Sequence, residues 1–172
     1  MYDKVFNADM KLCGFFNKAC HYTMINKSFS VISRLGNGIF WYALMILLPF
    51  IYGFSATLVV LQMAITGLSG SLIYYILKRG IERPRPYVVN DLIKLGTQPL
   101  DQFSFPSGHT LHAVGFSTIV CFYYSEFTIV LLPVTALIAI SRMLLGLHYP
   151  SDVLVGAGIG LLMAMLVLNI FN

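Results

Sequence analysis

From residue 39 onward, the chain consists of long hydrophobic runs separated by short polar stretches. There are five such runs, at residues 39–52, 55–77, 109–124, 127–145 and 153–171. A helix needs roughly 20 apolar residues to cross the hydrocarbon core of a bilayer, and fewer if it is kinked. The pattern therefore predicts an all-α, polytopic membrane helix bundle with about five transmembrane helices.

Residues 1–38 mix polar and apolar positions instead. Lys4, Asn7, Lys11 and Lys18 recur at helical spacing, and the apolar residues fall mainly on the other side. This favours an amphipathic helix in the membrane interface, with its basic face toward the headgroups. The alternative is a short helix packed on the rest of the protein. We therefore divide the chain into an interfacial segment, 1–38, and a transmembrane domain, 39–172.

Composition supports a membrane protein. Hydrophobic residues make up 58% of the chain and charged residues 10%, whereas soluble domains carry about 25% charged residues. The net charge of +4 is modest, and no nucleic-acid partner is expected. Gly156 and Gly160 form a small-xxx-small pair, which favours close helix packing within the chain. The oligomeric state stays open.

Alternating threading of the runs brings several polar segments to one membrane face. The second run ends at Lys78, the third begins at Ser107–His109, the fourth ends near 141–147, and the fifth begins at Asp152. Segments far apart in the sequence therefore converge on one surface. Charged residues at such a boundary usually face a polar cavity or a partner.

The cations of this face outnumber its carboxylates. They are Lys78, Arg83, Arg85 and Arg142. Arginine binds phosphate oxygens through two parallel hydrogen bonds, so the excess indicates an anion site.

Pro106-Ser107-Gly108-His109 precedes the third run. Ser107 is a plausible helix N-cap, and Gly108 allows close approach of a ligand to the backbone. The positive end of the helix favours an anion. By itself the segment could be an ordinary capped helix start, but His109 is unusual there.

His148 and Asp152 are four residues apart. The carboxylate could accept a hydrogen bond from one imidazole nitrogen and make the other nucleophilic; alternatively, Asp152 simply caps the last helix. With His109, the set suits phosphoryl transfer, in which one histidine attacks phosphorus and the other protonates the leaving oxygen. No cluster has metal-ligand spacing, so we expect no metal and no cofactor.

Three motifs together resemble a known signature: Lys78 with Arg85-Pro86, Pro106-Ser107-Gly108-His109, and Ser141-Arg142 with His148 and Asp152. They are similar to the type 2 phosphatidic acid phosphatase superfamily over residues 55–170. The resemblance implies that His148 is the nucleophile forming a phosphohistidine, Asp152 its orienting partner, and His109 the general acid. It also implies a metal-independent phosphate clamp of Lys78, Arg85, Ser107, Gly108 and Arg142.

Three further residues lie beside the signature. Arg83 is expected to contact a headgroup or to pair with Glu82. Tyr87 could line the pocket rim. His112, one turn beyond His109, is interpreted as a packing residue that could touch substrate.

The resemblance implies a membrane-embedded lipid phosphate or diphosphate phosphatase of the bacterial inner membrane, and we favour undecaprenyl diphosphate as substrate. Alternatives are phosphatidylglycerophosphate, phosphatidic acid or lipid A phosphate, and transfer of phosphate to another lipid. A non-catalytic protein that binds anionic lipid is a distant third, because it would need neither histidine. Most bacterial members place the active site in the periplasm, whereas the basic residues here gather on the catalytic side, which favours the cytoplasm. Because a basic interfacial helix can bind anionic lipid on either leaflet, we expect the periplasmic side.

Overall fold

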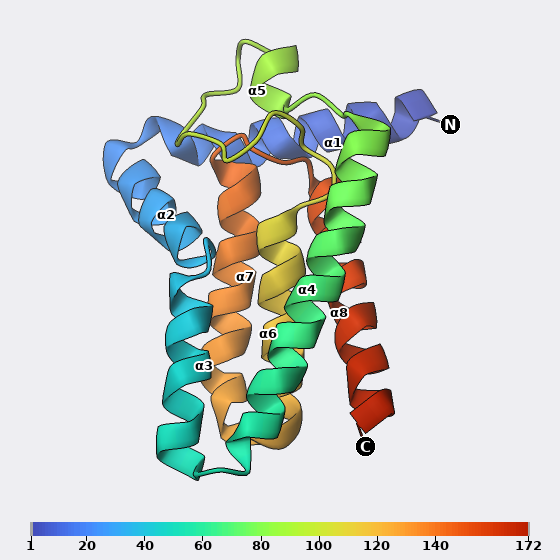
Figure 1. Cartoon of the computed structure of the whole chain (residues 1–172). Coiled ribbons are helices and arrows are strands. Elements are labelled where there is room, and N and C mark those ends of the chain that lie inside the picture. Colours follow the sequence, from blue (N-terminus) through green and yellow to red (C-terminus); the bar gives the residue numbers. More distant parts are fainter. Residues whose placement is uncertain (1, 172) are drawn as a thin grey trace.

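The computed structural model describes residues 2–171, and its elements are helices joined by turns and one long loop. The helices are α1 (Tyr2–Asn17), α2 (Thr23–Leu35), α3 (Ile39–Tyr52), α4 (Ala56–Ile81), α5 (Pro86–Val89), α6 (Gly108–Tyr123), α7 (Thr128–Leu144) and α8 (Pro150–Phe171). Short 3₁₀ turns, η1 (Lys18–His21) and η2 (Ser125–Phe127), join α1 to α2 and α6 to α7. Helices α3, α4, α6, α7 and α8 run along one another, while α1 and α5 lie across one end (Figure 1).

Each of the five hydrophobic runs forms a helix, so the polytopic helical fold is confirmed. Among the described residues, three segments are long and apolar enough to cross a membrane: 56–89, 125–144 and 150–171. Helices α2 and α3, bent by 50° at their junction, together make a fourth candidate. The remaining run, α6, has only 16 residues. The described residues thus contain three or four candidate membrane spans, fewer than the five or so that the sequence predicted.

The N-terminal segment forms two helices rather than one. Helix α1 lies across the end of the bundle where α4 ends and α8 begins (Figure 1). Its inner side buries Asp9, Cys13 and Asn17 against the bundle, while Leu12 and Phe15 on its other side are exposed. The side-chain amide of Asn17 donates from Nδ2 to the carbonyl oxygen of Leu144 at 2.8 Å. One face of α1 therefore packs on the protein, and its outer side carries exposed Lys4 and Lys11 beside Leu12 and Phe15.

Close packing of α6 on α8 positions the two signature segments that these helices begin. A Cβ atom at Gly156 would lie 2.5 Å from the carbonyl oxygen of Ser107, and one at Gly160 would lie 2.2 Å from that of Leu111. Only glycine allows such an approach, so the packing predicted for this pair within the chain is confirmed. The amide of Ser107 also donates to the carbonyl oxygen of Asp152 at 3.0 Å. The starts of α6 and α8 are thereby joined.

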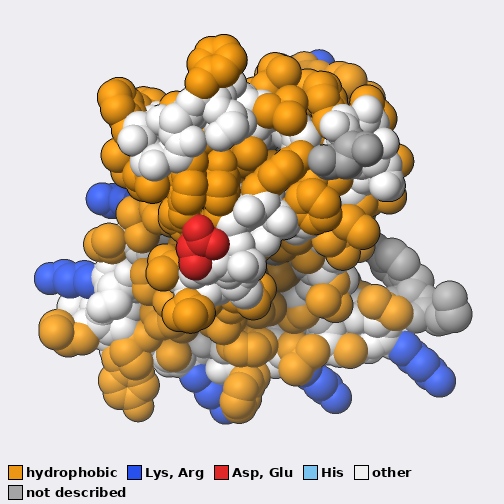
Figure 2. Space-filling model, turned by 90° about the horizontal axis from the view of Figure 1, so that it is seen from below, with side chains coloured by type: hydrophobic (Ala, Val, Ile, Leu, Met, Phe, Trp, Pro, Cys, Tyr) orange, Lys and Arg blue, Asp and Glu red, His pale blue; other side chains and the backbone are white. Residues whose placement is uncertain are grey.

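The hydrophobic core lies between α3, α4, α6, α7 and α8. Trp41, the chain's single tryptophan, is fully buried there, with its ring centroid 5.4 Å from that of Phe116. The end of the bundle opposite α1 is covered mainly by hydrophobic side chains, with one acidic group near its centre and basic side chains only around the edge (Figure 2). Large exposed apolar residues such as Ile129, Phe54 and Leu154 are typical of a lipid-facing surface. This distribution agrees with a bundle in a bilayer whose polar face is the α1 end.

Candidate active site

Three of the predicted clamp cations meet at the α1 end of the bundle. Lys78 comes from the last turn of α4, Arg85 from the residue before α5, and Arg142 from the last turn of α7. Their exposed fractions are 7%, 1% and 3%. Burying three like charges together is costly unless anions compensate them. The fold therefore holds a preformed anion site.

Two of these cations share one carboxylate, that of Asp101 in the loop between α5 and α6. Lys78 Nζ lies 2.7 Å from Asp101 Oδ1, and Arg85 Nη2 lies 2.7 Å from the same oxygen. The hydroxyl of Tyr74 donates to Asp101 Oδ2 at 2.6 Å. Burial acts to raise the pKa of Asp101, but the hydrogen bonds from Lys78 and Tyr74 outweigh it and lower the pKa to about 2. Asp101 is therefore ionised and takes the hydrogen bonds that a phosphate group would receive from these cations.

Arg142 is held differently. Its Nη1 donates to the hydroxyl of Ser33 on α2. Its Nε, although buried, has no hydrogen-bond partner among the described residues. Buried polar atoms are nearly always paired, so this guanidinium has donor capacity for an additional anion.

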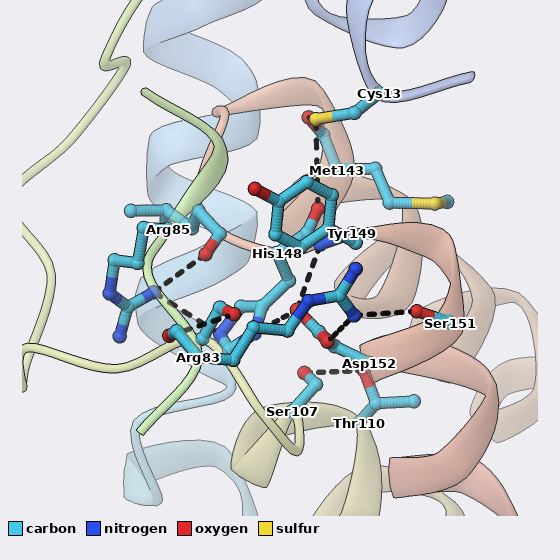
Figure 3. A network of polar contacts seen from close by, with 12 residues as sticks. Cys13, Arg83, Arg85, Ser107, Thr110, Met143, His148, Tyr149, Ser151 and Asp152 are labelled. Atoms are coloured by element: carbon cyan, nitrogen blue, oxygen red, sulfur yellow. Dashed lines mark hydrogen bonds and ion pairs between the residues drawn. The ribbon is translucent and has the colours of Figure 1, made fainter. Parts of the chain in front are cut away.

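His148 and Asp152 lie side by side at the start of α8 (Figure 3). His148 Nδ1 is 3.7 Å from Asp152 Oδ2, which is longer than a hydrogen bond, and among the described residues this buried nitrogen has no hydrogen-bond partner, so the hydrogen bond expected between the two side chains is not formed. The other ring nitrogen, Nε2, faces the clamp, 3.4 Å from Arg85 Nη1. Burial, followed by the charges of Arg142 and Arg85, lowers the pKa of His148 well below its usual value. The ring is therefore neutral, with Nε2 directed at the anion site.

Arg83 connects Asp152 to the N-terminal helix, and Figure 3 shows its contacts with Asp152 and Ser151. Its Nη1 lies 2.6 Å from Asp152 Oδ1, and its Nη2 lies 2.8 Å from Asp9 Oδ2 on α1. Asp9 also accepts a hydrogen bond from the amide of Ser151 at 3.0 Å. The ion pairs of Arg83 thus run to Asp9 and Asp152 and not to neighbouring Glu82, so the expected pair with Glu82 is wrong. The reason is that α1 places a carboxylate beside it.

His109 lies in the first turn of α6 and is 8% exposed. Its Nε2 is 2.5 Å from the side-chain oxygen of Asn37, which lies between α2 and α3. The residue before α6 is Ser107, as expected for an N-cap, although its hydroxyl contacts the Thr110 hydroxyl at 3.0 Å rather than a backbone amide. A Cβ atom at Gly108 would lie 2.9 Å from the ring of Tyr74, so this glycine also allows close packing.

The two remaining candidates have different positions. His112 Nδ1 is 2.9 Å from the carbonyl oxygen of Gly108, and its Nε2 is 3.0 Å from the Ser71 hydroxyl, which makes it a bridge between α6 and α4. Tyr87 packs on a cluster formed by Cys13, Ile93 and Tyr149 beneath α1.

A cavity of about 640 Å³ opens between α3, α4 and α6. Apolar side chains form most of its wall, and one of its polar lining residues, Tyr74, accepts a hydrogen bond from the clamp residue Lys78 at 2.7 Å. Its lining includes Trp41, Leu68, Phe116, Asn37, His109 and Tyr74. His109 therefore lies where an apolar groove meets the anion site.

Several residues of the site were not predicted from the sequence. Tyr74 lies one helical turn before Lys78, a spacing that could have suggested a shared face. Asp101 and Asn37 lie in non-helical segments with no motif around them, and Asp9 looked like one polar residue on an amphipathic helix. Their roles depend on tertiary contacts that periodicity does not report.

Comparison with known proteins places this geometry in a family. The model of the PAP2 superfamily matches residues 50–172. The undecaprenyl-diphosphatase BcrC of Bacillus subtilis is 34% identical over 114 residues, which cover 66% of this chain and 58% of that protein. Phosphatidylglycerophosphatase B of the same organism is 34% identical over 107 residues, 56% of this chain and 50% of that protein.

The fold agrees as well. The crystal structure of LpxE from Aquifex aeolicus superposes with a TM-score of 0.81 at 27% identity, covering 92% of this chain and 93% of that one. The chain spans about half the length of the curated relatives it matches. Since the family model covers most of the chain and the three signature motifs converge in space, this chain belongs to the PAP2 superfamily, as the motifs suggested.

Proposed function

We propose that the protein is a membrane-embedded, metal-independent lipid phosphatase that acts through a phosphohistidine on His148. The single observation that carries this proposal is the apolar groove leading to His109 beside a cluster of buried cations. A lipid could keep its chain among the helices and in the bilayer while its phosphate enters the clamp. A water-soluble phosphate ester would have no use for such a groove.

We infer that the two histidines act from different sides of the phosphate. His109 lines the cavity, on the side where the lipid part of a substrate would leave. His148 Nε2 faces Arg85 within the clamp. A phosphorus atom between them would have the nucleophile on one side and the proton donor on the other, which in-line displacement requires.

The reaction then proceeds in two displacements. His148 Nε2 uses its lone pair to form a bond to phosphorus; the bond from phosphorus to the leaving oxygen breaks, and His109 protonates that oxygen. Water next attacks the phosphohistidine, His109 accepts a proton from it, and inorganic phosphate leaves as His148 is regenerated. Asp152 stabilises the charge that develops on the His148 ring.

The clamp supplies the positive charge that this chemistry needs. Lys78, Arg85 and Arg142 carry three positive charges in a buried site. Such preorganised charges stabilise a transferring phosphoryl group. We therefore propose that turnover needs no added metal.

We favour undecaprenyl diphosphate as the substrate. The relative BcrC is named for that activity, and the apolar wall of the groove suits a prenyl chain. Phosphatidylglycerophosphate is the alternative substrate, because the second relative is named for activity on it, and it should be included in the same assay.

The proposal is tested by phosphate release from a panel of purified lipids in detergent micelles, with and without chelator. The expected result is release from undecaprenyl diphosphate that exceeds release from phosphatidylglycerophosphate and phosphatidic acid, is unaffected by chelator, and is lost in His148→Ala. Release that persists in His148→Ala, or that disappears with chelator, would contradict the mechanism. Recovery of label on an added lipid alcohol would indicate phosphate transfer instead of hydrolysis.

We also propose that the protein lies in the bacterial inner membrane with its active site in the periplasm, as in most bacterial members of the superfamily. Asn90, in the turn after α5, is a suitable reporter of that side. Cys13 and Cys20 are fully buried, so an Asn90→Cys, Cys121→Ser variant presents one accessible thiol. Labelling of intact cells by an impermeant reagent is expected; labelling only after permeabilisation would place the site in the cytoplasm.

A further inference from the structure

Asp101 has no counterpart in the signature, yet it contacts two of the clamp cations. Its Oδ1 lies 2.7 Å from Lys78 Nζ and 2.7 Å from Arg85 Nη2, and its Oδ2 accepts from Tyr74 at 2.6 Å. A planar anion held by an ammonium, a guanidinium and a hydroxyl makes the contacts that a phosphate would make in this clamp. The side chain is 32% exposed, whereas the side chains of Lys78 and Arg85 are 8% and 1% exposed. Asp101 therefore covers the cations from the solvent side.

The loop that carries Asp101 is anchored on both sides of it. The amide of Gly96 donates to the carbonyl oxygen of Leu145 at 3.1 Å, and the amide of Ser104 donates to the carbonyl oxygen of Arg83 at 2.8 Å. Between these anchors, Leu100 is 70% exposed. The backbone of Asp101 is also held, because its carbonyl oxygen accepts from Arg85 Nε at 3.2 Å. Displacement of the Asp101 carboxylate would leave both anchors in place.

We propose that Asp101 is a specificity-determining residue: its carboxylate occupies Lys78 and Arg85, and only a phosphate with more negative charge than a carboxylate displaces it. This inference rests on the proposed function of the same site. The relevant comparison is between terminal phosphate groups, which carry up to two negative charges, and the phosphodiesters of bulk phospholipids, which carry one. Bulk phosphodiesters surround the site at high concentration in the bilayer, and an uncovered clamp would bind them.

The charges of the site support this distinction. With Asp101 in place, the three buried cations of the clamp have a formal excess of two charges, and displacement of Asp101 exposes all three to the incoming phosphate. A tethered carboxylate competes at an effective concentration of about millimolar or more. A monoanionic phosphodiester gains no more charge interaction than the carboxylate it replaces, while a dianion gains interaction with Lys78, Arg85 and the unpaired Nε of Arg142. Both ligands compete with Asp101 for the clamp, but only the dianion displaces it.

The test measures binding directly, without turnover. Asp101→Asn keeps the shape of the side chain and removes its charge. Calorimetric titration of the purified protein at alkaline pH would use methylphosphonate, a dianion that cannot be cleaved as an ester, and dimethyl phosphate, a monoanionic phosphodiester. Because a hydrogen bond to a charged group is worth about a ten- to hundred-fold factor in an equilibrium constant, Asp101→Asn is expected to tighten both ligands at least ten-fold. Dimethyl phosphate binding should then become measurable.

Two controls separate competition from structural damage. Asp91→Asn removes an exposed carboxylate from the same loop and should leave both affinities unchanged. Asp101→Glu retains the charge and should keep the weak dimethyl phosphate binding of the wild type. If Asp101→Asn binds methylphosphonate no better than wild type, or more weakly, Asp101 holds the clamp together and the proposal is overturned.

Specificity is tested by adding phosphatidylglycerol to the micellar hydrolysis assay. Turnover by Asp101→Asn should fall as this phosphodiester lipid is increased, while wild-type turnover should remain constant. Equal insensitivity of the two proteins would overturn the specificity role. If no lipid is hydrolysed but the binding shift is present, the proposed function fails and the role of Asp101 in anion competition stands. Hydrolysis without the binding shift supports the proposed function and overturns the role of Asp101.

Discussion

The ion pairs between Asp9, Arg83 and Asp152 predict that the N-terminal helix stabilises Asp152, the carboxylate beside His148. Arg83 bridges the two acids at 2.8 and 2.6 Å, and the three side chains are 6%, 16% and 0% exposed. We consider Arg83→Met, which keeps the apolar stem and removes the guanidinium. Since it leaves two buried carboxylates without their cation, the expected loss in free energy of unfolding is about 3–5 kcal/mol.

A double-mutant cycle separates this effect from general damage. Asp9→Asn keeps its shape and can still accept hydrogen bonds from Ser151, and Arg83 retains Asp152, so the expected loss is only about 1–3 kcal/mol. In the double variant, Asp9 no longer carries an unpaired charge. The free energies of unfolding lost in the two single variants should therefore add up to about 1–3 kcal/mol more than the loss in the double variant.

Tryptophan fluorescence in detergent micelles is a suitable assay, because Trp41 is the chain's single tryptophan and is fully buried in the core. Denaturant midpoints and slopes of the four proteins yield the cycle, with Arg79→Met as the matched control. Arg79 lies on the exposed side of α4 and stacks on Tyr75 at 4.2 Å, so its loss should change stability by less than about 1 kcal/mol. Strict additivity, or equal effects at Arg83 and Arg79, would refute the coupling between α1 and the site.

Three other predictions follow from the packing and the charges. Gly160→Ala places a methyl group against a backbone carbonyl of α6 and should cost at least about 1–3 kcal/mol, whereas Gly158→Ala, with nothing within 4 Å, should be neutral or slightly stabilising in the same unfolding assay; equal effects would contradict the packing. Asn37→Ala should slow turnover about ten-fold and alter the pH–rate profile, because His109 loses the acceptor of its Nε2 proton. An unchanged pH–rate profile would show that Asn37 only packs. Folding lowers the pKa of His148 below 6.5, so the unfolded chain takes up the extra proton at a higher pH than the folded protein does, and the free energy of unfolding should fall as the pH drops below about 6.5. His148→Gln should reduce that fall. An identical pH dependence in the variant would refute the lowered pKa of His148.

The helices could be predicted because hydrophobic length is a local property. The run at residues 39–52 coincides with α3, and the others differ by a few residues from α4, α6, α7 and α8. The number of spans was less accurate, since α6 is short and α2 reaches toward α3 through a 50° bend. Trp41 shows the same limitation: a tryptophan near the start of a hydrophobic run is typical of an interfacial anchor, but this one packs on Phe116 and is buried in the core.

The signature residues could be placed because alternating threading is enough to bring helix ends together. The anionic half of the site could not be predicted, because Asp101 and Asp9 reach the cations through a loop and through a helix outside the family match. Arg83 shows the consequence. Its sequence neighbour Glu82 suggested a local ion pair, but two carboxylates distant in sequence take that place.

The central claim, that two histidines act on one phosphate from opposite sides, is tested most directly by trapping the intermediate. Rapid quenching of the purified protein during turnover of a terminally ³²P-labelled lipid diphosphate should yield an acid-labile, base-stable label on His148. His109→Ala should form and lose that label more slowly, because both the leaving oxygen and the attacking water lose their proton-transfer partner, and His148→Ala should carry none. Label on another residue, or phosphate release without any protein-bound label, would contradict the account.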